Sequence, residues 1–402
     1  MNYITRHIEA LIKDLCKTFP SLMIIGARQA GKSTTLENIY GRNNYITFDN
    51  LQSEIAAKND GLFFLKQNSY PLILDEIHYV PSLFRDLKIM IDEIKENGMY
   101  LITDSQQYSA IRELNESLSG RIALIKLLPL SIREKYDLVN NGEFIPDNNF
   151  ISKIGNKKTE DITKDILIGG YPKICSNHDI NISVYFESYI NTYIEKDVKK
   201  LNNIEDSEKF LNFLKIIASK SGQQINYSSI SKEIRVSMPT VERWTMILQS
   251  SNIIHILQPF YKNSIEKSLY KTPKIYFIDT GLLCHLLHIT NIDVLKNHFL
   301  FGSIFETFVV SEILKSYTNV GKNPDWYYFR DKKGNEIDLI LKNGLEYYAI
   351  EIKSNDNVSY CKQFENVASL YKMKFKTNII ISNTNSIKVV GGGTYVLPAF
   401  LI

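Results

Sequence analysis

The residues LMIIGARQAGKST (22–34) decide the fold of the first third of the chain. Four apolar residues, Leu22–Ile25, predict a buried strand, and they lead into Gly26–Ser33, which matches the pattern GxxxxGK[ST]. The glycines let backbone N–H groups curl around phosphate oxygens, and the start of the following helix adds a favourable dipole. Lys32 is expected to reach the β- and γ-phosphates, and the Ser33 hydroxyl to ligate Mg²⁺. The stretch predicts a nucleoside-triphosphate site.

A second motif completes this site. The apolar run Leu72–Leu74 predicts a buried strand that ends in Asp75 and Glu76. An aspartate in this place holds Mg²⁺ through its shell, and Glu76 is placed to orient or deprotonate the attacking water, which indicates hydrolysis rather than storage. An acidic pair after a strand is more often a solvated turn, but the upstream GKS motif favours the catalytic interpretation.

Further strands follow the same α/β alternation. Tyr45–Phe48 falls between the two motifs and Tyr100–Thr103 after them, the arrangement of additional-strand NTPases. Thr103 and Ser105 are placed to sense the γ-phosphate, although ordinary strand-end polar residues fit equally well. Arg121 is a candidate arginine finger, in cis or across a subunit boundary, with a surface arginine as the alternative. The predicted nucleotide-binding residues are Gly26, Ala27, Arg28, Gln29, Ala30, Gly31, Lys32, Ser33, Thr34, Thr103 and Ser105.

The composition is that of an ordinary globular chain. Its 402 residues suggest roughly two to four domains, and 44% apolar with 23% charged residues excludes a disordered or collagen-like chain. A net charge of +3 is too small to imply a nucleic-acid partner by itself. Charges interrupt the first apolar stretch, so we expect no signal peptide, no membrane span and a cytoplasmic location. The four scattered cysteines indicate reduced thiols rather than a zinc site.

Several phrases along nearly the whole chain resemble prokaryotic AAA-type ATPases that carry an uncharacterised C-terminal domain. These are GARQAGKSTTL, PLILDEIHYVPSLFRDLK, LITDSQQY, ESLSGRIALIKLLPLS, GGYPKI and PKIYFIDTGLLCHLL. The resemblance implies ATP binding and hydrolysis, and it supports the finger role of Arg121, which matches a G-R in the family. The family shows T-G-S at the sensor strand, whereas this chain has Thr103-Asp104-Ser105, which places an extra carboxylate near the expected γ-phosphate.

The middle of the chain predicts a winged helix-turn-helix. Residues 210–275 carry nine Lys or Arg against three acids, a basic excess that the net charge conceals. A short helix (Ser228–Ile234), a turn and a helix capped by Ser237 (Met238–Ser250) precede two β-type runs.

This module has two interpretations. Thr240, Arg243 and Thr245 lie away from the apolar stripe of the second helix and would face a DNA major groove, while Lys262 and Lys267 would contact phosphates. Winged helices also serve as lids or protein-docking units, so DNA contact and protein contact both stay open.

The segment 334–353 predicts a β-hairpin. Asn343-Gly344 separates two alternating runs, and a two-residue turn there places Asp338 opposite Ala349 and Glu336 opposite Glu351. Strict alternation gives one charged and one apolar face, which a two-residue slip preserves and a one-residue slip destroys. The charged face holds Glu336, Asp338, Glu351 and Lys353. The apolar face holds Ile337, Leu339, Leu341, Tyr348, Ile350 and Ile352.

Asp338 and Glu351 offer oxygen ligands for Mg²⁺, and Lys353 would position water or stabilise phosphorane charge. The arrangement resembles the PD-(D/E)xK core of restriction endonucleases and junction resolvases over roughly the last hundred residues. The resemblance adds Glu306, on a preceding helix, as a third acidic ligand, whereas Ile337 replaces the motif's proline. The alternatives are a solvated amphipathic hairpin and a nuclease fold without activity.

We therefore predict an α/β protein whose parts are an AAA-type, additional-strand P-loop core (1–135), a helical lid (136–204), a winged helix-turn-helix (205–292) and a restriction-endonuclease-like domain (293–402). The expected cofactors are ATP and Mg²⁺, with a second Mg²⁺ or Mn²⁺ in the C-terminal domain. The ATP cycle would control how residues 210–275 and the C-terminal domain engage DNA or a protein partner, in a chain that is also a candidate homo-oligomer. The alternatives are an ATP-regulated DNA nuclease and a protein-remodelling or scaffold ATPase with an inactive nuclease-like domain.

Overall fold

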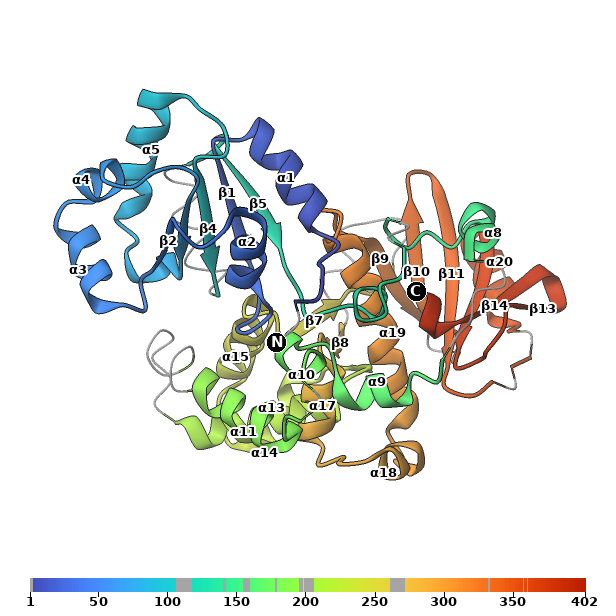
Figure 1. The fold of residues 1–402 in the computed structure, drawn as a ribbon. Coiled ribbons are helices and arrows are strands. Elements are labelled where there is room, and N and C mark those ends of the chain that lie inside the picture. The colour runs from blue at the N-terminus through green and yellow to red at the C-terminus, as the bar shows by residue number, and fades with distance from the viewer. Residues whose placement is uncertain are drawn as a thin grey trace.

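The protein is described by a computed structural model, and Figure 1 shows three sheets joined by helices. The first sheet and its helices form one lobe and the C-terminal sheet forms another. Most helices of the middle region lie below and between them, whereas α8 lies beside the C-terminal sheet (Figure 1). Lys262 and Lys267, the predicted wing contacts, lie outside the described part of the chain. The described residues are 3–105, 118–139, 142–154, 160–177, 179–194, 198, 206–260, 272–331, 333–356, 358–359 and 361–402.

The first sheet has five parallel strands in the order β2-β3-β4-β1-β5. They are β1 (Ser21–Ile25), β2 (Tyr45–Thr47), β3 (Leu72–Asp75), β4 (Tyr100–Asp104) and β5 (Ile122–Lys126). Strand β4 lies between β1 and β3, the topology expected of an additional-strand NTPase. Because the strands are parallel, the GKS loop after β1 and the acidic pair at the end of β3 meet at one edge of the sheet.

Helices cover both faces of this sheet, so β1 is buried along its whole length, as is typical of parallel sheets. Apolar residues of α1 and α2 pack on one face, and those of α4 and α5 on the other. The helices of this lobe are α1 (Glu9–Thr18), α2 (Lys32–Tyr40), α3 (Leu51–Asn59), α4 (Gly61–Lys66), α5 (Leu83–Ile94) and the 3-10 turn η1 (Ile77–Tyr79).

The middle region is mostly helical and contains a small antiparallel sheet in the order β6-β8-β7. Its strands are β6 (Gln223–Gln224), β7 (Ile254–Leu257) and β8 (Lys274–Phe277). Its helices are α7 (Ile132–Lys135), α8 (Asn148–Ile154), α9 (Thr163–Ile168), α10 (Pro172–Cys175), α11 (Ile182–Tyr193), α13 (Ser207–Ser219), α14 (Tyr227–Ile234), α15 (Met238–Ser250), α17 (Thr280–Leu286) and α18 (Ile292–Asn297).

The second helix of the predicted helix-turn-helix differs from expectation at one position. Ser237 caps α15 by accepting a hydrogen bond from the Thr240 backbone N–H, and Arg243 is exposed, as predicted. Thr245 is buried, and its hydroxyl donates to the Val241 carbonyl at 2.8 Å, so the prediction that it faces outward is wrong. A threonine satisfied by its own helix can join the core.

The C-terminal sheet has six strands in the order β13-β14-β12-β11-β10-β9. Strands β9, β10 and β11 are antiparallel, whereas β12 runs parallel to β11 and to β14. The elements are α19 (Phe301–Thr318), β9 (Asp325–Arg330), β10 (Glu336–Asn343), β11 (Glu346–Lys353), α20 (Gln363–Tyr371), β12 (Phe375–Ser382), β13 (Lys388–Val390), β14 (Thr394–Pro398) and the 3-10 turns η3 (Gly391–Gly393) and η4 (Ala399–Leu401).

The hairpin pairs in a register two residues away from the predicted one. Ala349 pairs with Ile340 rather than with Asp338, and Asn343 pairs with Glu346. The predicted opposition of Glu336 and Glu351 is therefore also wrong. The turn consists of Gly344 and Leu345 because glycine takes the first turn position with φ +60°, a conformation that side chains disfavour. An even slip preserves the charged face.

A bulge changes one apolar position. The pairing of β10 with β9 shifts between Ile337 and Ile340, and Ile337 packs in one cluster with Ile340 and Ala349, away from Leu339. The prediction that Ile337 shares a face with Leu339 is wrong, because the extra residue of a bulge turns the strand.

One hydrophobic cluster spans the middle region and one face of the C-terminal sheet. It contains Phe213 of α13, Leu283 of α17, Val309 of α19 and Leu339 of β10. Helix α19 lies at the centre of the molecule and is buried almost all round, which explains its continuous apolar pattern (Figure 1). Among the described residues, no helix combines the length and the apolar character needed to cross a lipid bilayer.

Candidate nucleotide site and acidic pocket

The GKS loop joins β1 to α2 and leaves its backbone open to a ligand. Gly26 is required because a Cβ there would overlap the Leu127 carbonyl, and Gly31 adopts φ +95°, which disfavours any side chain. The Lys32 ammonium donates to the carbonyls of Gly26 and Ala27, each at 3.1 Å. The predicted phosphate-binding lysine therefore folds back onto the GKS loop and binds two of its carbonyls.

The structure brings Ser33 and Asp75 together. The Ser33 hydroxyl donates to Asp75 Oδ1 at 2.6 Å, and the Tyr45 hydroxyl donates to Oδ2 at 2.6 Å. The Thr103 hydroxyl also donates to Oδ1. A hydroxyl and a carboxylate at this distance are the hard oxygen ligands that Mg²⁺ prefers. The sequence predicted Ser33, Asp75 and Thr103 here, whereas Tyr45 carried no motif that pointed to it.

Glu76 has a strained backbone and an ionised side chain. Its φ is +55°, which is uncommon for a residue with a side chain and typical of functional sites. Its Oε2 accepts hydrogen bonds from the Ser105 backbone at 3.2 Å and hydroxyl at 2.9 Å. Burial acts to raise its pKa, but the hydrogen bond with His78 and the charge of Lys32 prevail and hold the pKa of Glu76 well below its usual range. The carboxylate is available to accept a proton or orient a water.

The departure from the T-G-S pattern is compensated by His78. The His78 Nδ1 lies 2.9 Å from Asp104 Oδ1 and 3.3 Å from Glu76 Oε2, and its side chain is 2% exposed. Burial acts to lower its pKa, but hydrogen bonds with Asp104 and Glu76 prevail and raise the pKa of His78 to about 9. The imidazolium therefore neutralises the extra carboxylate. In the described part of the chain, these three side chains are also the group whose ligand atoms converge to within 4.8 Å.

A pocket of about 400 Å³ adjoins the GKS loop. Its lining includes Lys32, Ser33 and Glu76, and also Pro172 and Lys173 from the GGYPKI phrase. The sequence indicated only a turn in the helical lid for this phrase, and the signal of a further role was its recurrence in the resembling family. Tyr3, Ile4 and Arg6 of the N-terminal segment also line the pocket.

Arg121 does not reach this pocket. It precedes β5, and its backbone carbonyl accepts from the Ser21 N–H at the beginning of β1, at the opposite edge of the sheet from the GKS loop. Its guanidinium pairs with Asp92 of α5 at 2.6 Å. The structure thus separates Arg121 from the nucleotide site of its own chain.

The four predicted acidic and basic residues of the C-terminal site do share one pocket. Glu306, Asp338, Glu351 and Lys353 all line it, together with Glu336. Asp338 Oδ2 accepts from the Ile352 backbone N–H at 2.8 Å, which ties the two strands together.

The carboxylates that line this pocket repel one another. Burial, and then the neighbouring Asp338 carboxylate, raise the pKa of both Glu306 and Glu351 to about 7. Burial likewise raises the pKa of Asp338 against the opposing effect of Lys274. Lys353 pairs with Glu351 at 2.6 Å. Buried acids that raise one another's pKa are characteristic of functional sites.

A buried lysine that no sequence pattern indicated contacts the acids of this pocket. Lys274, which was counted in the basic excess of residues 210–275, is 3% exposed and lies 3.0 Å from both Glu306 and Glu336. It is unavailable for phosphate contacts because the acids surround it. Its position in β8, far from the acids in the chain, left no sequence signal.

Arg6 connects the GKS loop to the segment that follows β5. Its guanidinium donates to the carbonyls of Ala30 at 2.9 Å and Leu128 at 2.7 Å, and it pairs with Glu134 at 3.0 Å. Glu134 also closes a capping box with Ser131. This arginine and glutamate are both buried, so the contacts fix the segment 128–134 relative to the loop.

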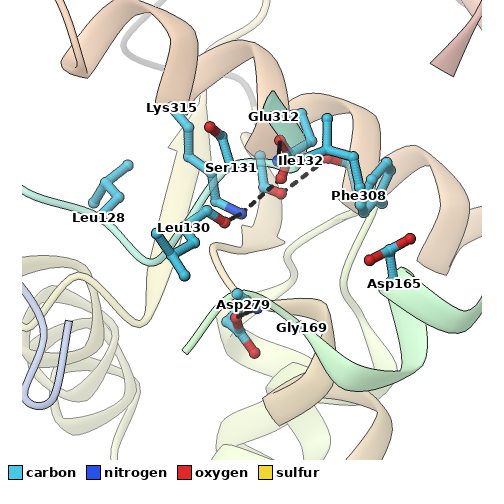
Figure 2. Close-up of polar contacts among 12 residues, drawn as sticks. Leu128, Leu130, Ser131, Ile132, Asp165, Gly169, Asp279, Phe308, Glu312 and Lys315 are labelled. Atoms are coloured by element: carbon cyan, nitrogen blue, oxygen red, sulfur yellow. Dashed lines mark hydrogen bonds and ion pairs between the residues drawn. The ribbon is translucent and has the colours of Figure 1, made fainter. Parts of the chain in front are cut away.

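Helix α19 also contacts this segment (Figure 2). Glu312 accepts from the Ile132 N–H at 2.7 Å, and the Lys315 ammonium donates to the Leu130 carbonyl at 3.2 Å and to Glu312 at 2.7 Å. Leu130 in turn donates its N–H to the Gly170 carbonyl at 2.7 Å. A continuous set of buried polar contacts therefore runs from the GKS loop to the C-terminal domain.

Three family models match successive parts of the chain. Residues 18–136 match the family model of the AAA domain. Residues 159–293 and 301–402 match two families that are each described as a domain of unknown function, DUF8612 and DUF4143.

Similar proteins cover most of the chain. An uncharacterized protein of Mycobacterium tuberculosis is 26% identical over 358 residues, covering 88% of this chain and 75% of that protein. An uncharacterized protein of Methanocaldococcus jannaschii is 23% identical over 426 residues, covering 98% and 85%. A Walker-type ATPase of Pyrococcus abyssi has 14% identity and a TM-score of 0.40, covering 70% of this chain and 94% of that one. The AAA match and the strand order around the GKS loop make the first third of this protein an AAA-type P-loop domain, followed by C-terminal residues that match a domain of unknown function.

Proposed function

We propose that this protein hydrolyses ATP with Mg²⁺ and that the nucleotide state controls how its middle and C-terminal parts engage DNA or a protein partner. The observation that carries the proposal is the contact of Ser33 with Asp75, beside an ionised Glu76. These groups come from two motifs and meet at the carboxyl edge of a parallel sheet, which is where such folds bind ligands.

Each residue has a distinct role in this proposal. The backbone of the GKS loop binds the phosphates, and Lys32 exchanges the carbonyls of Gly26 and Ala27 for phosphate oxygens. Ser33 and Asp75 hold Mg²⁺, which neutralises phosphate charge when bound. Glu76 orients the attacking water and accepts its proton.

The sensor strand supports the placement of these groups. Thr103 donates to Asp75, and Ser105 donates to Glu76, so each hydroxyl positions a carboxylate. His78 cancels the charge of Asp104 and leaves the region facing the γ-phosphate without an additional negative charge. We assign the sensor role to Thr103 and Ser105 through these contacts.

The contacts of segment 128–134 support a link between nucleotide state and the C-terminal domain. Arg6 joins the segment to the GKS loop, and Glu312 and Lys315 join it to α19. A change at the loop that moves the segment would therefore break buried hydrogen bonds to α19. Arg121, which is remote from its own site, would act only across a subunit boundary.

A nuclease is the second candidate, because Glu306, Asp338, Glu351 and Lys353 gather in one pocket. A helix carrying a glutamate, then a hairpin carrying Asp338 and the Glu351-Ile352-Lys353 triplet, is the order that the PD-(D/E)xK resemblance leads one to expect. In this interpretation, residues 210–275 would bind DNA as a winged helix, with Arg243 exposed on its second helix.

The ATPase proposal is tested by two substitutions and a matched control. Lys32→Ala should abolish ATP binding. Glu76→Gln should retain binding and lower the rate of phosphate release by about 10²–10⁴-fold, the usual contribution of a general base. Glu54→Gln, which alters an exposed ion pair on α3, should change neither. Wild-type protein that neither binds ATP nor releases phosphate would refute the proposal.

A time course on supercoiled, linear and branched DNA separates the downstream alternatives. Wild type, Lys32→Ala and Asp338→Asn are compared with and without ATP and Mg²⁺. Cleavage that Asp338→Asn abolishes while ATP hydrolysis persists would support the nuclease. Salt-sensitive binding without cleavage would support a regulatory DNA-binding module, and ATP hydrolysis indifferent to DNA would support a protein-remodelling or scaffold role.

A further inference from the structure

Lys274 of the middle region contacts three acids that line the pocket of the C-terminal domain. It begins β8, and its ammonium lies 3.0 Å from Glu306 Oε1, 3.0 Å from Glu336 Oε1 and 3.7 Å from Asp338 Oδ1. The side chain is 4% exposed. A buried ammonium needs such partners, because an isolated charge in the interior is strongly unfavourable.

We propose that the Lys274 ammonium is the cation that these acids hold in place of a divalent metal ion. The acids then bind Mg²⁺ or Mn²⁺ only when the Lys274 side chain has moved away from them. The inference deepens the nuclease candidate and does not depend on ATP hydrolysis. In this structure the Lys274 side chain of β8 pairs with the acids that would otherwise hold the metal.

The contacts of Glu306 support this assignment. The same oxygen, Oε1, accepts from Lys274 and from the Tyr276 hydroxyl at 2.6 Å, and both donors come from β8. A metal ion at this oxygen would have to displace one of them. An ammonium and a divalent cation within a few ångströms also repel each other, so the two occupants exclude one another.

The second observation is an unpartnered oxygen of Glu351, an acid that Lys274 does not contact. Glu351 is 7% exposed and lines the pocket, and its Oε2 has no hydrogen-bond donor among the described residues, while Lys353 holds Oε1. A buried carboxylate oxygen without a donor is unfavourable. It is the ligand atom that a metal between Glu351 and Asp338 would use once the neighbouring ammonium has left.

The test measures Mn²⁺ binding to the nucleotide-free full chain by electron paramagnetic resonance. Lys274→Met keeps the length of the side chain and removes its charge. We expect this variant to bind one additional Mn²⁺ with an affinity at least about tenfold above that of wild type, because the acids lose their counter-charge. The additional site should disappear in Lys274→Met/Asp338→Asn. Two controls should match wild type: Lys274→Arg, which retains the charge, and Lys322→Met, which removes a lysine from an exposed ion pair.

Two results would overturn the inference. The first is wild-type protein that binds Mn²⁺ tightly at a site that Asp338→Asn abolishes, a comparison that needs no change at Lys274. The second is a folded Lys274→Met variant, verified by circular dichroism, that gains no Mn²⁺ site. Neither result bears on ATP hydrolysis, so failure here and failure of the ATPase proposal are distinguishable.

Discussion

Replacing His78 by glutamine tests the charge balance of the nucleotide site. The imidazole lies between Asp104 at 2.9 Å and Glu76 at 3.3 Å, and both acids are largely buried. Glutamine retains hydrogen-bonding capacity but carries no positive charge. The two carboxylates would then face each other near the expected γ-phosphate without compensation, so we expect weaker ATP binding as well as a less stable domain.

The magnitude follows from the pKa of His78, which rises from 6.5 to about 9 in the folded protein. Since one pKa unit corresponds to about 1.4 kcal/mol, the charged histidine contributes on the order of 3 kcal/mol to stability. Because the pKa is higher in the folded than in the unfolded state, this contribution is complete below pH 6.5 and is lost as the pH rises through 9. The difference in unfolding free energy between wild type and His78→Gln should therefore shrink by that amount between about pH 6 and pH 10.

Urea unfolding followed by circular dichroism measures this difference, and NMR titration of the histidine imidazoles measures the pKa directly. His288→Asn, at an exposed position with a positive φ that asparagine tolerates, is the matched control and should show no such pH-dependent loss. A wild-type His78 that titrates at or below 6.5, or a stability difference that does not change with pH, would refute the reasoning.

Three further predictions concern the frame around the site. Gly170→Ala should lower the melting temperature by several degrees, because a Cβ there would overlap the Leu130 carbonyl. Gly302→Ala is the control, because a Cβ there meets no neighbouring atom. Equal melting temperatures of the two variants would contradict this packing. Glu312→Gln should destabilise the protein by about 1–3 kcal/mol in urea unfolding, since it weakens the charge-assisted hydrogen bond from the Ile132 N–H and removes the ion pair with Lys315. An unchanged midpoint would count against the role of these contacts. Arg121→Ala should leave ATP hydrolysis per chain unchanged in dilute, monomeric protein, and a loss of activity there would show that the arginine acts within its own chain.

Local pattern was sufficient for most of the nucleotide site. Ser33 and Asp75 follow buried strands, and parallel strands bring their carboxyl ends to one edge, so their meeting could be predicted without a structure. The hairpin faces were predictable for a similar reason, because alternation survives an even change of register. The register itself was not, because Asn343-Gly344 permits more than one turn, and the bulge at Ile337 depends on packing against β9.

Contacts between distant segments could not be predicted from the sequence. Tyr45, His78 and Lys274 each bind a carboxylate supplied by another strand or helix, and none belongs to a spacing motif that signals it. The number of basic residues that 210–275 presents at the surface was overestimated for the same reason, since Lys274 is buried. Strands β13 and β14 were also missed, because strands of three and five residues carry little periodic pattern.

By itself, the sequence determined the parallel α/β core, the GKS loop with its acidic partner and the charged face of the C-terminal hairpin. All three depend on periodicity and on residue types that are close together in the chain. Residues close in the chain are kept close in space by the backbone itself. The tertiary structure alone decided which charges neutralise which. A buried carboxylate requires a cation or a hydrogen-bond donor. The packing of the strands and helices decides which cation comes close enough to neutralise Asp104 or Glu306.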